Sequence, residues 1–381
     1  MTSLLAPFTL RGVTLRNRIV VPPMCQYSAT DGLAQPWHMV QYGRFAVGGA
    51  GLVILEATAV SPEGRITHGD LGIWSAGHAA ALAPIAAFMA SQGCVPGIQL
   101  GHAGRKASMQ RPWYGNGPLN AEDRARGDLP WTILAPSAIP VDDGYMTPAA
   151  LDEAGIERLI DAFAEGARRA AGAGFAVVEL HMAHGYLLAS FLSPLSNRRN
   201  DAFGGDAAGR QRFPLAVARA VRAAFPADKP VFVRISAVDG AEGGLTLEDQ
   251  IGFARELKTT GIDVVDCSSG GIAGSATAAR GPRRDYGFQV PYAKAIRAEA
   301  GIPTMAVGLI VDPRHAQLVL DEGSADLIAV GRQCLEDPNW PQRAQAMLTG
   351  ATQWADWPRQ HGWWLANRAG TLDRLGPWQA R

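Results

Sequence analysis

The chain of 381 residues has no excess charge of either sign, because 35 lysines and arginines balance 35 aspartates and glutamates. Proteins that bind nucleic acid usually present a basic surface, so this balance argues against a nucleic-acid partner. The sequence also lacks the run of roughly 18 to 20 apolar residues that a membrane-spanning helix requires. No basic segment followed by an apolar run marks a secretory signal. These absences predict a soluble, cytoplasmic protein with no membrane partner.

Cysteine is scarce and scattered, occurring only at Cys25, Cys94, Cys267 and Cys334. No two of them stand at the spacing of a metal-binding pair, and a chain of this length does not depend on a disulfide framework. Charged residues make up only 18% of the chain, whereas hydrophobic residues make up 47%. This composition excludes extensive disorder and supplies enough apolar material for a large core.

Apolar runs recur along the chain, and amphipathic segments separate them. Several runs are continuous rather than alternating, as in parallel strands that are buried on both faces. They predict eight strands, at residues 19–22, 52–57, 95–100, 176–181, 231–236, 263–267, 304–307 and 327–330.

The segments between these strands carry helical periodicity and helix-start signals. After the third strand, Thr147 and Pro148 predict the N-cap and first turn of a helix. Thr246 and Asp312 predict the starts of two further helices. An alternation of strand and helix repeated eight times predicts a single parallel (β/α)8 barrel. An open, doubly wound sheet remains the alternative, because a strand count does not establish closure.

Two segments stand apart from this alternation. Residues 111–144, rich in proline, glycine and tryptophan, predict a long loop insertion after the third strand. We expect a barrel domain over residues 1–350 and a C-terminal tail over residues 351–381. Five tryptophans are too many apolar side chains to face water, so the tail is expected to pack on the barrel or on a second subunit. They are Trp354, Trp357, Trp363, Trp364 and Trp378.

Glycines end the last two predicted strands, at Gly308 and Gly331, and Arg332 follows directly. Backbone N–H groups at this place form the usual phosphate site of the barrel fold, although both glycines could instead only make tight turns. Arg234 ends the fifth strand, and a guanidinium inside a barrel mouth needs an anionic partner. Together these residues predict a ligand with a phosphate at one end and delocalised negative charge elsewhere, such as a reduced flavin mononucleotide.

Two histidines follow the fourth strand, at His181 and His184, and Tyr186 comes two residues later. They could ligate a metal, but no HExxH helix and no carboxylate at ligand spacing accompanies them, so no metal site is predicted. They could also be core histidines satisfied by hydrogen bonds. The functional interpretation is a pair of donors to one carbonyl oxygen, with Tyr186 protonating the neighbouring carbon.

Cys25 and Tyr27 stand at the mouth of the first strand. Cys25 is either a small buried apolar residue or a cofactor contact, and its position favours the contact. Tyr27 is either an aromatic wall or a second hydroxyl donor. Lys106 could form a Schiff base, but no accompanying motif supports that function.

Seven segments, in order, resemble the Old Yellow Enzyme family, and they span nearly the whole chain. They are PPMCQYS at residues 22–28, EATAVSPEGRI at 56–66, GIQLGHAGRKAS at 97–108, ELHMAHGYLLASFLSPLSNRRNDAFGG at 179–205, VRIS at 233–236, DCSSGG at 266–271 and AVGRQCLEDPNW at 329–340. Cys25 followed by Tyr27 resembles the thermophilic-like subclass, which includes the xenobiotic reductases. The tail does not clearly reproduce the family's terminal arginine, which reaches into a neighbouring subunit.

The resemblance implies a flavoprotein with tightly but non-covalently bound FMN. Arg234 would lie at the N1–C2 edge of the isoalloxazine ring, and Gly308, Gly331 and Arg332 would hold the phosphate. The ring would also contact Pro23, Met24, Cys25, Ala57 and Gln99.

The resemblance further implies an ene-reductase that acts as a homodimer or homotetramer on small activated alkenes. NADPH, or alternatively NADH, would reduce the flavin, which would then pass hydride to the β-carbon of an unsaturated carbonyl or nitro compound. Tyr186 would protonate the α-carbon, and Cys25 would tune the flavin potential. The substrate would contact Tyr27, His181, His184, Tyr186, Tyr286 and Phe288.

Other activities fit the sequence less well. A tRNA dihydrouridine synthase would need a basic face and an RNA-binding domain, and a hydroxy-acid oxidase would need a different arrangement of histidine and arginine. A demethylating relative would carry an iron–sulfur cysteine cluster and a further nucleotide domain. A metal hydrolase would contain zinc and be colourless, and a non-catalytic barrel would not turn over enones.

Overall fold

The computed structural model describes residues 3–274 and 284–379. Eight parallel strands form a closed barrel, in the spatial order β10-β11-β12-β3-β4-β5-β8-β9. The pairing of Ile328 with Ile19 joins β12 to β3, so the sheet closes and the open-sheet alternative is wrong. All eight predicted strands are confirmed, as β3 (Ile19–Val21), β4 (Leu52–Ala59), β5 (Val95–Gly101), β8 (Val177–Met182), β9 (Val231–Ser236), β10 (Val264–Ser268), β11 (Thr304–Ala306) and β12 (Leu327–Ala329).

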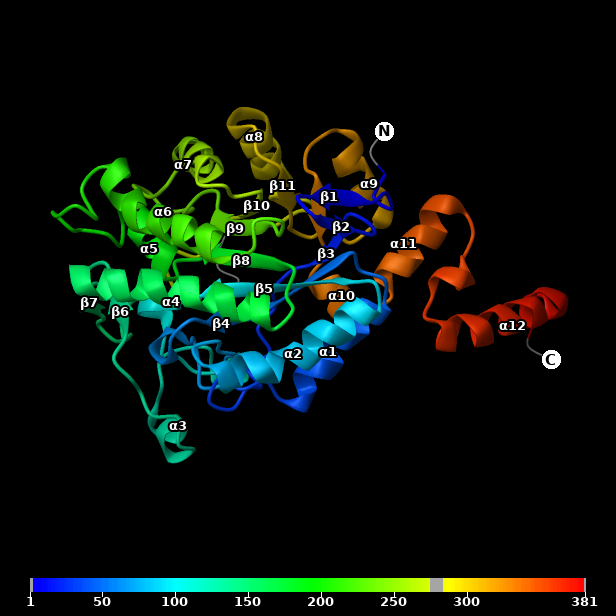
Figure 1. The fold of residues 1–381 in the computed structure, drawn as a ribbon, viewed down its shortest axis with the longest axis horizontal. Coiled ribbons are helices and arrows are strands. Elements are labelled where there is room, and N and C mark those ends of the chain that lie inside the picture. The colour runs from blue at the N-terminus through cyan, green and yellow to red at the C-terminus, as the bar shows by residue number, and fades with distance from the viewer. Residues whose placement is uncertain (1–2, 275–283, 380–381) are drawn as a thin grey trace.

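Helices cover the outside of the barrel (Figure 1). Among residues 3–274 and 284–379, no helix combines the length and the apolar composition that crossing a bilayer requires. The covering helices are α1 (Pro36–Val47), α2 (Ala76–Ser91), α4 (Glu153–Gly172), α5 (Leu187–Leu192), α6 (Ala207–Ala224), α7 (Leu247–Thr259), α8 (Val290–Ala300), α9 (Pro313–Asp321), α10 (Arg332–Glu336) and α11 (Trp340–Thr349).

Apolar side chains fill two separate regions, inside the barrel and between the barrel and its helices. The interior cluster includes Val20, Leu52, Phe232 and Met305, all fully buried. A hairpin of β1 (Phe8–Leu10) and β2 (Val13–Leu15) packs against this cluster. Because the lower interior is filled with apolar residues, the polar residues farther along the same strands gather at the opposite, C-terminal end.

The predicted start of α4 is wrong, whereas those of α7 and α9 are confirmed. Ala149 and Ala150 form the short strand β7, which pairs with β6 (Leu134–Ala135), so Thr147 lies outside the helix. The N-cap is Asp152, whose carboxylate accepts the N–H of Gly155 at 2.7 Å. An aspartate N-cap satisfies a helix donor as well as threonine does, so local preference alone does not choose between them.

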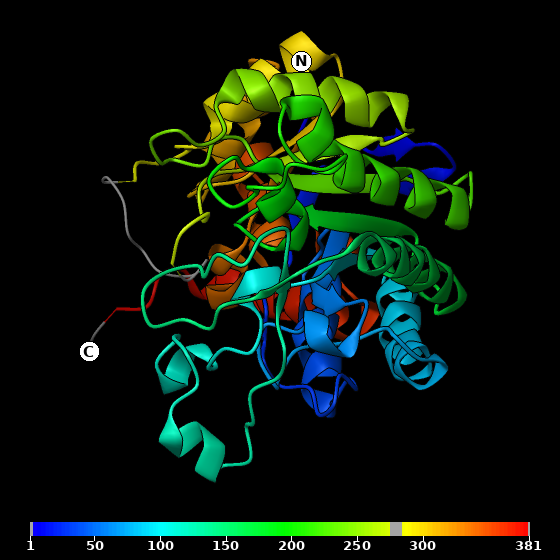
Figure 2. The same ribbon diagram turned by 90° about the vertical axis from the view of Figure 1, so that its left-hand side faces the viewer.

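The segment between β5 and α4 extends away from the barrel mouth (Figure 2). It contains η2 (Gly104–Lys106), η3 (Pro112–Tyr114) and α3 (Ala121–Ala125). The tail, with η4 (Trp354–Asp356) and α12 (Arg359–Leu375), projects to the far side of α11 (Figure 1). Trp363 and Trp364 are 60% and 68% exposed, so the tail does not bury them on its own barrel.

Candidate active site

A cavity of about 620 Å³ opens at the C-terminal ends of the barrel strands. Its walls come from the ends of β3, β8, β9, β10, β11 and β12 and from the segments that follow them. The predicted site residues that line it are Pro23, Met24, His184, Arg234, Phe288, Gly308, Gly331 and Arg332. Tyr286 is 74% exposed and lies outside this lining, contrary to the expected pocket contact.

Ala57, His181 and Tyr186 line a much smaller space of about 10 Å³, together with Asp70 and His102. Such a volume is close to that of one water molecule. Nδ1 of His102 accepts the N–H of Gly104, and its Nε2 is buried without a hydrogen-bond partner among the described residues. The space therefore has a polar donor available for a bound water beside Tyr186.

His181 and His184 lie together, as the sequence predicts. His181 is the penultimate residue of β8, and its Nε2 lies 3.4 Å from Nδ1 of His184. Burial lowers the pKa of both imidazoles, and the positive charge of Arg234 lowers it further. Both rings are therefore neutral at neutral pH, and each has one N–H to donate.

The loop that carries His184 is held in an uncommon conformation, with a φ of 59° at His184. Its backbone N–H donates to Oγ of Ser236 at 2.9 Å, and its carbonyl accepts from Nζ of Lys106 at 2.8 Å. Lys106 also donates to the carbonyl of Gly271, so two of its N–H groups hold loop carbonyls. Burial lowers the pKa of Lys106 to about 7, yet its hydrogen bonds give it a structural function rather than that of a Schiff base.

Tyr186 lies beside the histidine pair, with its ring centroid 4.8 Å from that of His181. Burial raises the pKa of the Tyr186 hydroxyl well above its usual value, and the nearby carboxyl group of Asp70 adds to this effect. The phenol therefore retains its proton throughout the physiological pH range. Its position next to a pair of neutral donors fits the function of a proton donor.

Cys25 and Tyr27 lie in the segment that follows β3. Burial raises the pKa of the Cys25 thiol, and the carboxylates of Asp70 and Glu56 raise it further, so the thiol is neutral. Tyr27 has a φ of 51°, and its ring meets that of Trp113, from η3, edge to face at 5.9 Å. The insertion after β5 thus reaches the edge of the site.

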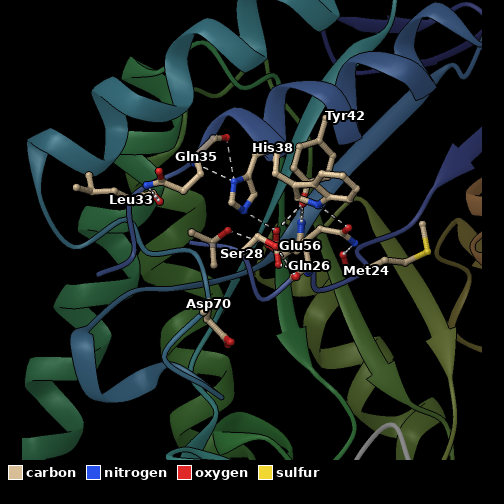
Figure 3. A network of polar contacts seen from close by, with 12 residues as sticks. Met24, Gln26, Ser28, Leu33, Gln35, His38, Tyr42, Glu56 and Asp70 are labelled. Atoms are coloured by element: carbon tan, nitrogen blue, oxygen red, sulfur yellow. Dashed lines mark hydrogen bonds and ion pairs between the residues drawn. The ribbon is translucent and has the colours of Figure 1, made fainter. Parts of the chain in front are cut away.

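A buried network behind this segment holds it in place (Figure 3). The carboxylate of Glu56, on β4, accepts the backbone N–H of Gln26 at 2.5 Å and the hydroxyl of Tyr42 at 3.0 Å. Nε2 of His38 lies 3.2 Å from the same carboxylate. Because Gln26 stands between Cys25 and Tyr27, Glu56 anchors the backbone that carries both side chains.

We expect Glu56→Gln to lower the free energy of unfolding by about 1–3 kcal/mol, because buried donors lose their carboxylate acceptor. Urea unfolding at pH 7, followed by tryptophan fluorescence, measures this change. Glu157→Gln, at an exposed position on α4, is the matched control and should stay within about 0.5 kcal/mol of the parent. Equal stability of the two variants would contradict the proposed anchoring function of Glu56.

A polar layer crosses the barrel beneath the cavity. Nε of Arg234 lies 3.1 Å from the carboxylate of Asp266, and Gln99 donates to Glu179 at 2.7 Å. Arg234 also lines the cavity, and its Nε is buried without a hydrogen-bond partner among the described residues. Burial raises the pKa of Asp266 and raises that of Glu179 to about 8. The guanidinium thus offers free N–H groups to an anionic or electron-rich ligand edge.

The far end of the cavity suits a phosphate. Gly308 has a φ of 120°, and a Cβ there would approach Phe288 to 3.1 Å, so only glycine fits. Arg332 lines the same end and has no carboxylate partner among the described residues. The guanidinium of Arg234 at the floor of the cavity suits the ring of FMN. Arg332 and the glycine backbone at the far end suit its phosphate.

From the sequence, no site function is predicted for Glu56, Asp70 or Ser268, and Lys106 is considered only as a Schiff-base lysine. Glu56, Lys106 and Ser268 belong to quoted segments, but their contacts join residues far apart in the chain. Asp70 lies outside those segments and accepts hydrogen bonds from Ile66 and Thr67. For Ser268 and His184, the two residues lie 84 positions apart. The available sequence signal is polarity near the end of a barrel strand, which Glu56 and Ser268 both show and which does not identify their partners.

Comparison with known proteins agrees with this geometry. The NADH:flavin oxidoreductase / NADH oxidase family matches residues 3–350. An NADPH dehydrogenase of Geobacillus thermodenitrificans is 45% identical over 351 residues, which cover 91% of this chain and 95% of that protein. An NADPH dehydrogenase of Bacillus subtilis is 42% identical over 347 residues, with coverage of 91% and 95%.

Solved structures give the same answer. Morphinone reductase superposes with a TM-score of 0.75 at 26% identity, over 92% of this chain and 90% of that one. An Old Yellow Enzyme homologue from Zymomonas mobilis superposes with a TM-score of 0.73 at 27% identity, over 92% and 93%. The chain therefore belongs to the NADH:flavin oxidoreductase / NADH oxidase family, as its resemblance to the Old Yellow Enzymes predicts, and is an FMN-dependent oxidoreductase reduced by a nicotinamide nucleotide.

Proposed function

We propose that this oxidoreductase is an ene-reductase that reduces the C=C bond of α,β-unsaturated carbonyl or nitro compounds. The observation that carries the proposal is the neutral histidine pair, with its facing nitrogens 3.4 Å apart, next to Tyr186. Bound FMN would supply the hydride chemistry that links a nicotinamide nucleotide to the β-carbon of the substrate.

The histidine pair polarises the substrate. Two N–H groups directed at one carbonyl or nitro oxygen stabilise the negative charge that develops there as hydride arrives. Neutral imidazoles suit this function because they donate hydrogen bonds without giving up a proton. Tyr27, whose pKa is raised by burial, is positioned by its segment to add a third donor.

The remaining residues protonate the substrate or hold the flavin. Tyr186 keeps its proton until the α-carbon becomes basic and then transfers it, which completes the reduction. We assign Cys25, as a neutral thiol, to the flavin ring contact that tunes the potential. The other ring contacts are assigned to Pro23, Met24 and Ala57, which line the two spaces described above, and to Gln99, which lies in the polar layer beneath the cavity. Arg234 is assigned to the ring edge, and Gly308, Gly331 and Arg332 are assigned to the phosphate.

Anaerobic spectroscopy of the purified protein tests this function. The preparation should be yellow and release FMN on denaturation, NADPH should bleach it, and 2-cyclohexenone should restore the colour. Cyclohexanone, which has the carbonyl but no alkene, is the control and should leave the reduced protein bleached. Reduced protein that reacts with oxygen but not with any activated alkene would exclude ene reduction.

The exposed tryptophans of α12 lead us to propose that a second copy of the chain covers the tail. Trp363 and Trp364 stand together on the helix with ring centroids 4.6 Å apart, and burying them would remove a large apolar surface from water. Light scattering after size-exclusion chromatography should give the mass of a dimer or tetramer. Replacing both residues by glutamate should lower the mass toward that of a monomer, and an unchanged mass would place the interface elsewhere.

A further inference from the structure

Ser268 stands at the end of β10 with its hydroxyl against the outer nitrogen of His184. The Oγ atom lies 2.7 Å from Nε2 of His184, the short distance of a well-formed hydrogen bond. Ser268 is only 5% exposed, and its hydroxyl contacts no other polar group of the described residues. The hydroxyl can act as donor or acceptor, so its direction depends on which nitrogen of His184 carries hydrogen.

The tautomer of His181 follows from its own contacts. Its Nδ1 accepts the backbone N–H of Ala183 at 3.2 Å. A neutral imidazole whose Nδ1 accepts must carry its hydrogen on Nε2. His181 therefore directs its single N–H at the space that Nδ1 of His184 also faces.

His184 has two possible tautomers with different consequences. If Nε2 carries the hydrogen, it donates to Ser268, and Nδ1 accepts from His181 across 3.4 Å, so neither ring has a donor left for a ligand. If Nδ1 carries the hydrogen, the hydroxyl of Ser268 donates to Nε2. Two N–H groups then face the same point, and both require an acceptor there.

We infer that Ser268 is a positioning residue, whose hydroxyl donates to Nε2 of His184 and thereby keeps the hydrogen on Nδ1, facing the ligand oxygen. The inference rests on the proposed function, in which both histidines bind that oxygen. The distances agree with it, because the Ser268 contact is short, whereas 3.4 Å between two nitrogens is long for a hydrogen bond. A shared oxygen acceptor between the rings satisfies both donors.

Ser236 provides a matched control one strand away. It pairs in register with Ser268, is equally buried, and also contacts His184. Its Oγ, however, accepts the backbone N–H of His184 and donates to the carbonyl of Gly270. Ser236→Ala therefore removes the same chemical group beside the same residue without touching the imidazole.

Long-range ¹H–¹⁵N correlation spectra of the ¹⁵N-histidine-labelled holoenzyme, saturated with 4-chlorophenol as an oxygen ligand, read the tautomer directly. We expect His184 to carry hydrogen on Nδ1 in the parent, Ser268→Thr and Ser236→Ala proteins. In Ser268→Ala the Nε2–H form should appear, and the Kd for the phenol should rise about tenfold, the effect of one lost hydrogen bond.

Two results would overturn the inference: an Nε2–H His184 in the parent complex, or an unchanged tautomer in Ser268→Ala. The parent spectrum decides by itself if the alanine variant does not fold. The tautomer measurement needs no turnover, so it can fail or succeed independently of the proposed function. The proposed function fails if the parent enzyme binds the phenol but reduces no activated alkene.

Discussion

Replacing Tyr186 by phenylalanine is expected to slow the oxidative half-reaction by about 10²- to 10⁴-fold, the usual contribution of a positioned general acid. The ring would still pack against His181, so the fold and the binding of the oxidised substrate should change little. The reductive half-reaction with NADPH needs no proton from this residue and should keep its rate. Stopped-flow absorbance, under anaerobic conditions and with saturating 2-cyclohexenone, measures both half-reactions.

Tyr27→Phe is the matched control for Tyr186→Phe, because both tyrosines are buried at the same site. If Tyr27 only assists binding, its loss should raise the enone concentration needed for saturation and leave the saturated rate within about tenfold. The parent rate should also stay flat up to about pH 9, since burial raises the pKa of Tyr186. An unchanged saturated rate in Tyr186→Phe would remove this residue as the proton donor.

Arg234→Met is expected to lower the free energy of unfolding by about 3–5 kcal/mol at pH 8.5, because it leaves a buried carboxylate without its cation. Asp266 is 0% exposed, and neither of its carboxylate oxygens has a hydrogen bond among the described residues. Glu179, also fully buried, lies in the same polar layer. FMN affinity, measured by fluorescence titration, should fall as well, because the guanidinium faces the cavity.

The loss of stability in Arg234→Met should be larger at high pH than at low pH. The pKa of Glu179 is raised to about 8 and that of Asp266 is raised, so the folded state binds protons that the unfolded chain has already released. Stability therefore falls as pH rises from the unfolded carboxyl pKa of about 4 toward 8, and removing the cation steepens this fall. Lowering the pH to 5.5 should restore part of the loss.

Two further variants test the cause of that loss. Arg234→Lys keeps a positive charge and should lose less stability than Arg234→Met. The double variant Arg234→Met/Asp266→Asn removes the uncompensated charge and should recover much of the difference. Urea unfolding at pH 5.5 and 8.5 measures all four proteins. Equal losses at both pH values would show that packing, not charge, accounts for the effect.

The family match ends at residue 350, directly after the barrel's last helix, α11, ends at Thr349. The tail therefore lies outside the part of the chain that the family model covers. The composition of the tail predicts that its tryptophans are buried on the barrel or on a second subunit. In the single chain, Trp363 and Trp364 remain exposed, so the barrel does not bury them. Trp378, at 86% exposed, is the extreme case.

Local sequence predicted the strands and several helix starts because the determining interactions are local. A continuous apolar run such as that at β4 marks a strand buried on both faces, and Thr246 caps α7 through contacts within one turn. Thr147 shows the limit of this approach, since Asp152 was an equally good cap. The choice between them came from the pairing of β7 with β6, which local preference does not include.

The sequence by itself determined the eight strands, the glycines Gly308 and Gly331 that follow two of them, and the place of the histidine pair, because each depends on residues at a strand end. Only the tertiary structure decided that β12 meets β3, that Lys106 holds the His184 loop, and that Ser268 and Glu56 face their partners. These contacts join strands distant in sequence, and their geometry depends on the barrel closing. Hydrogen bonds need positions accurate to a few tenths of an ångström, which residue type and spacing do not specify.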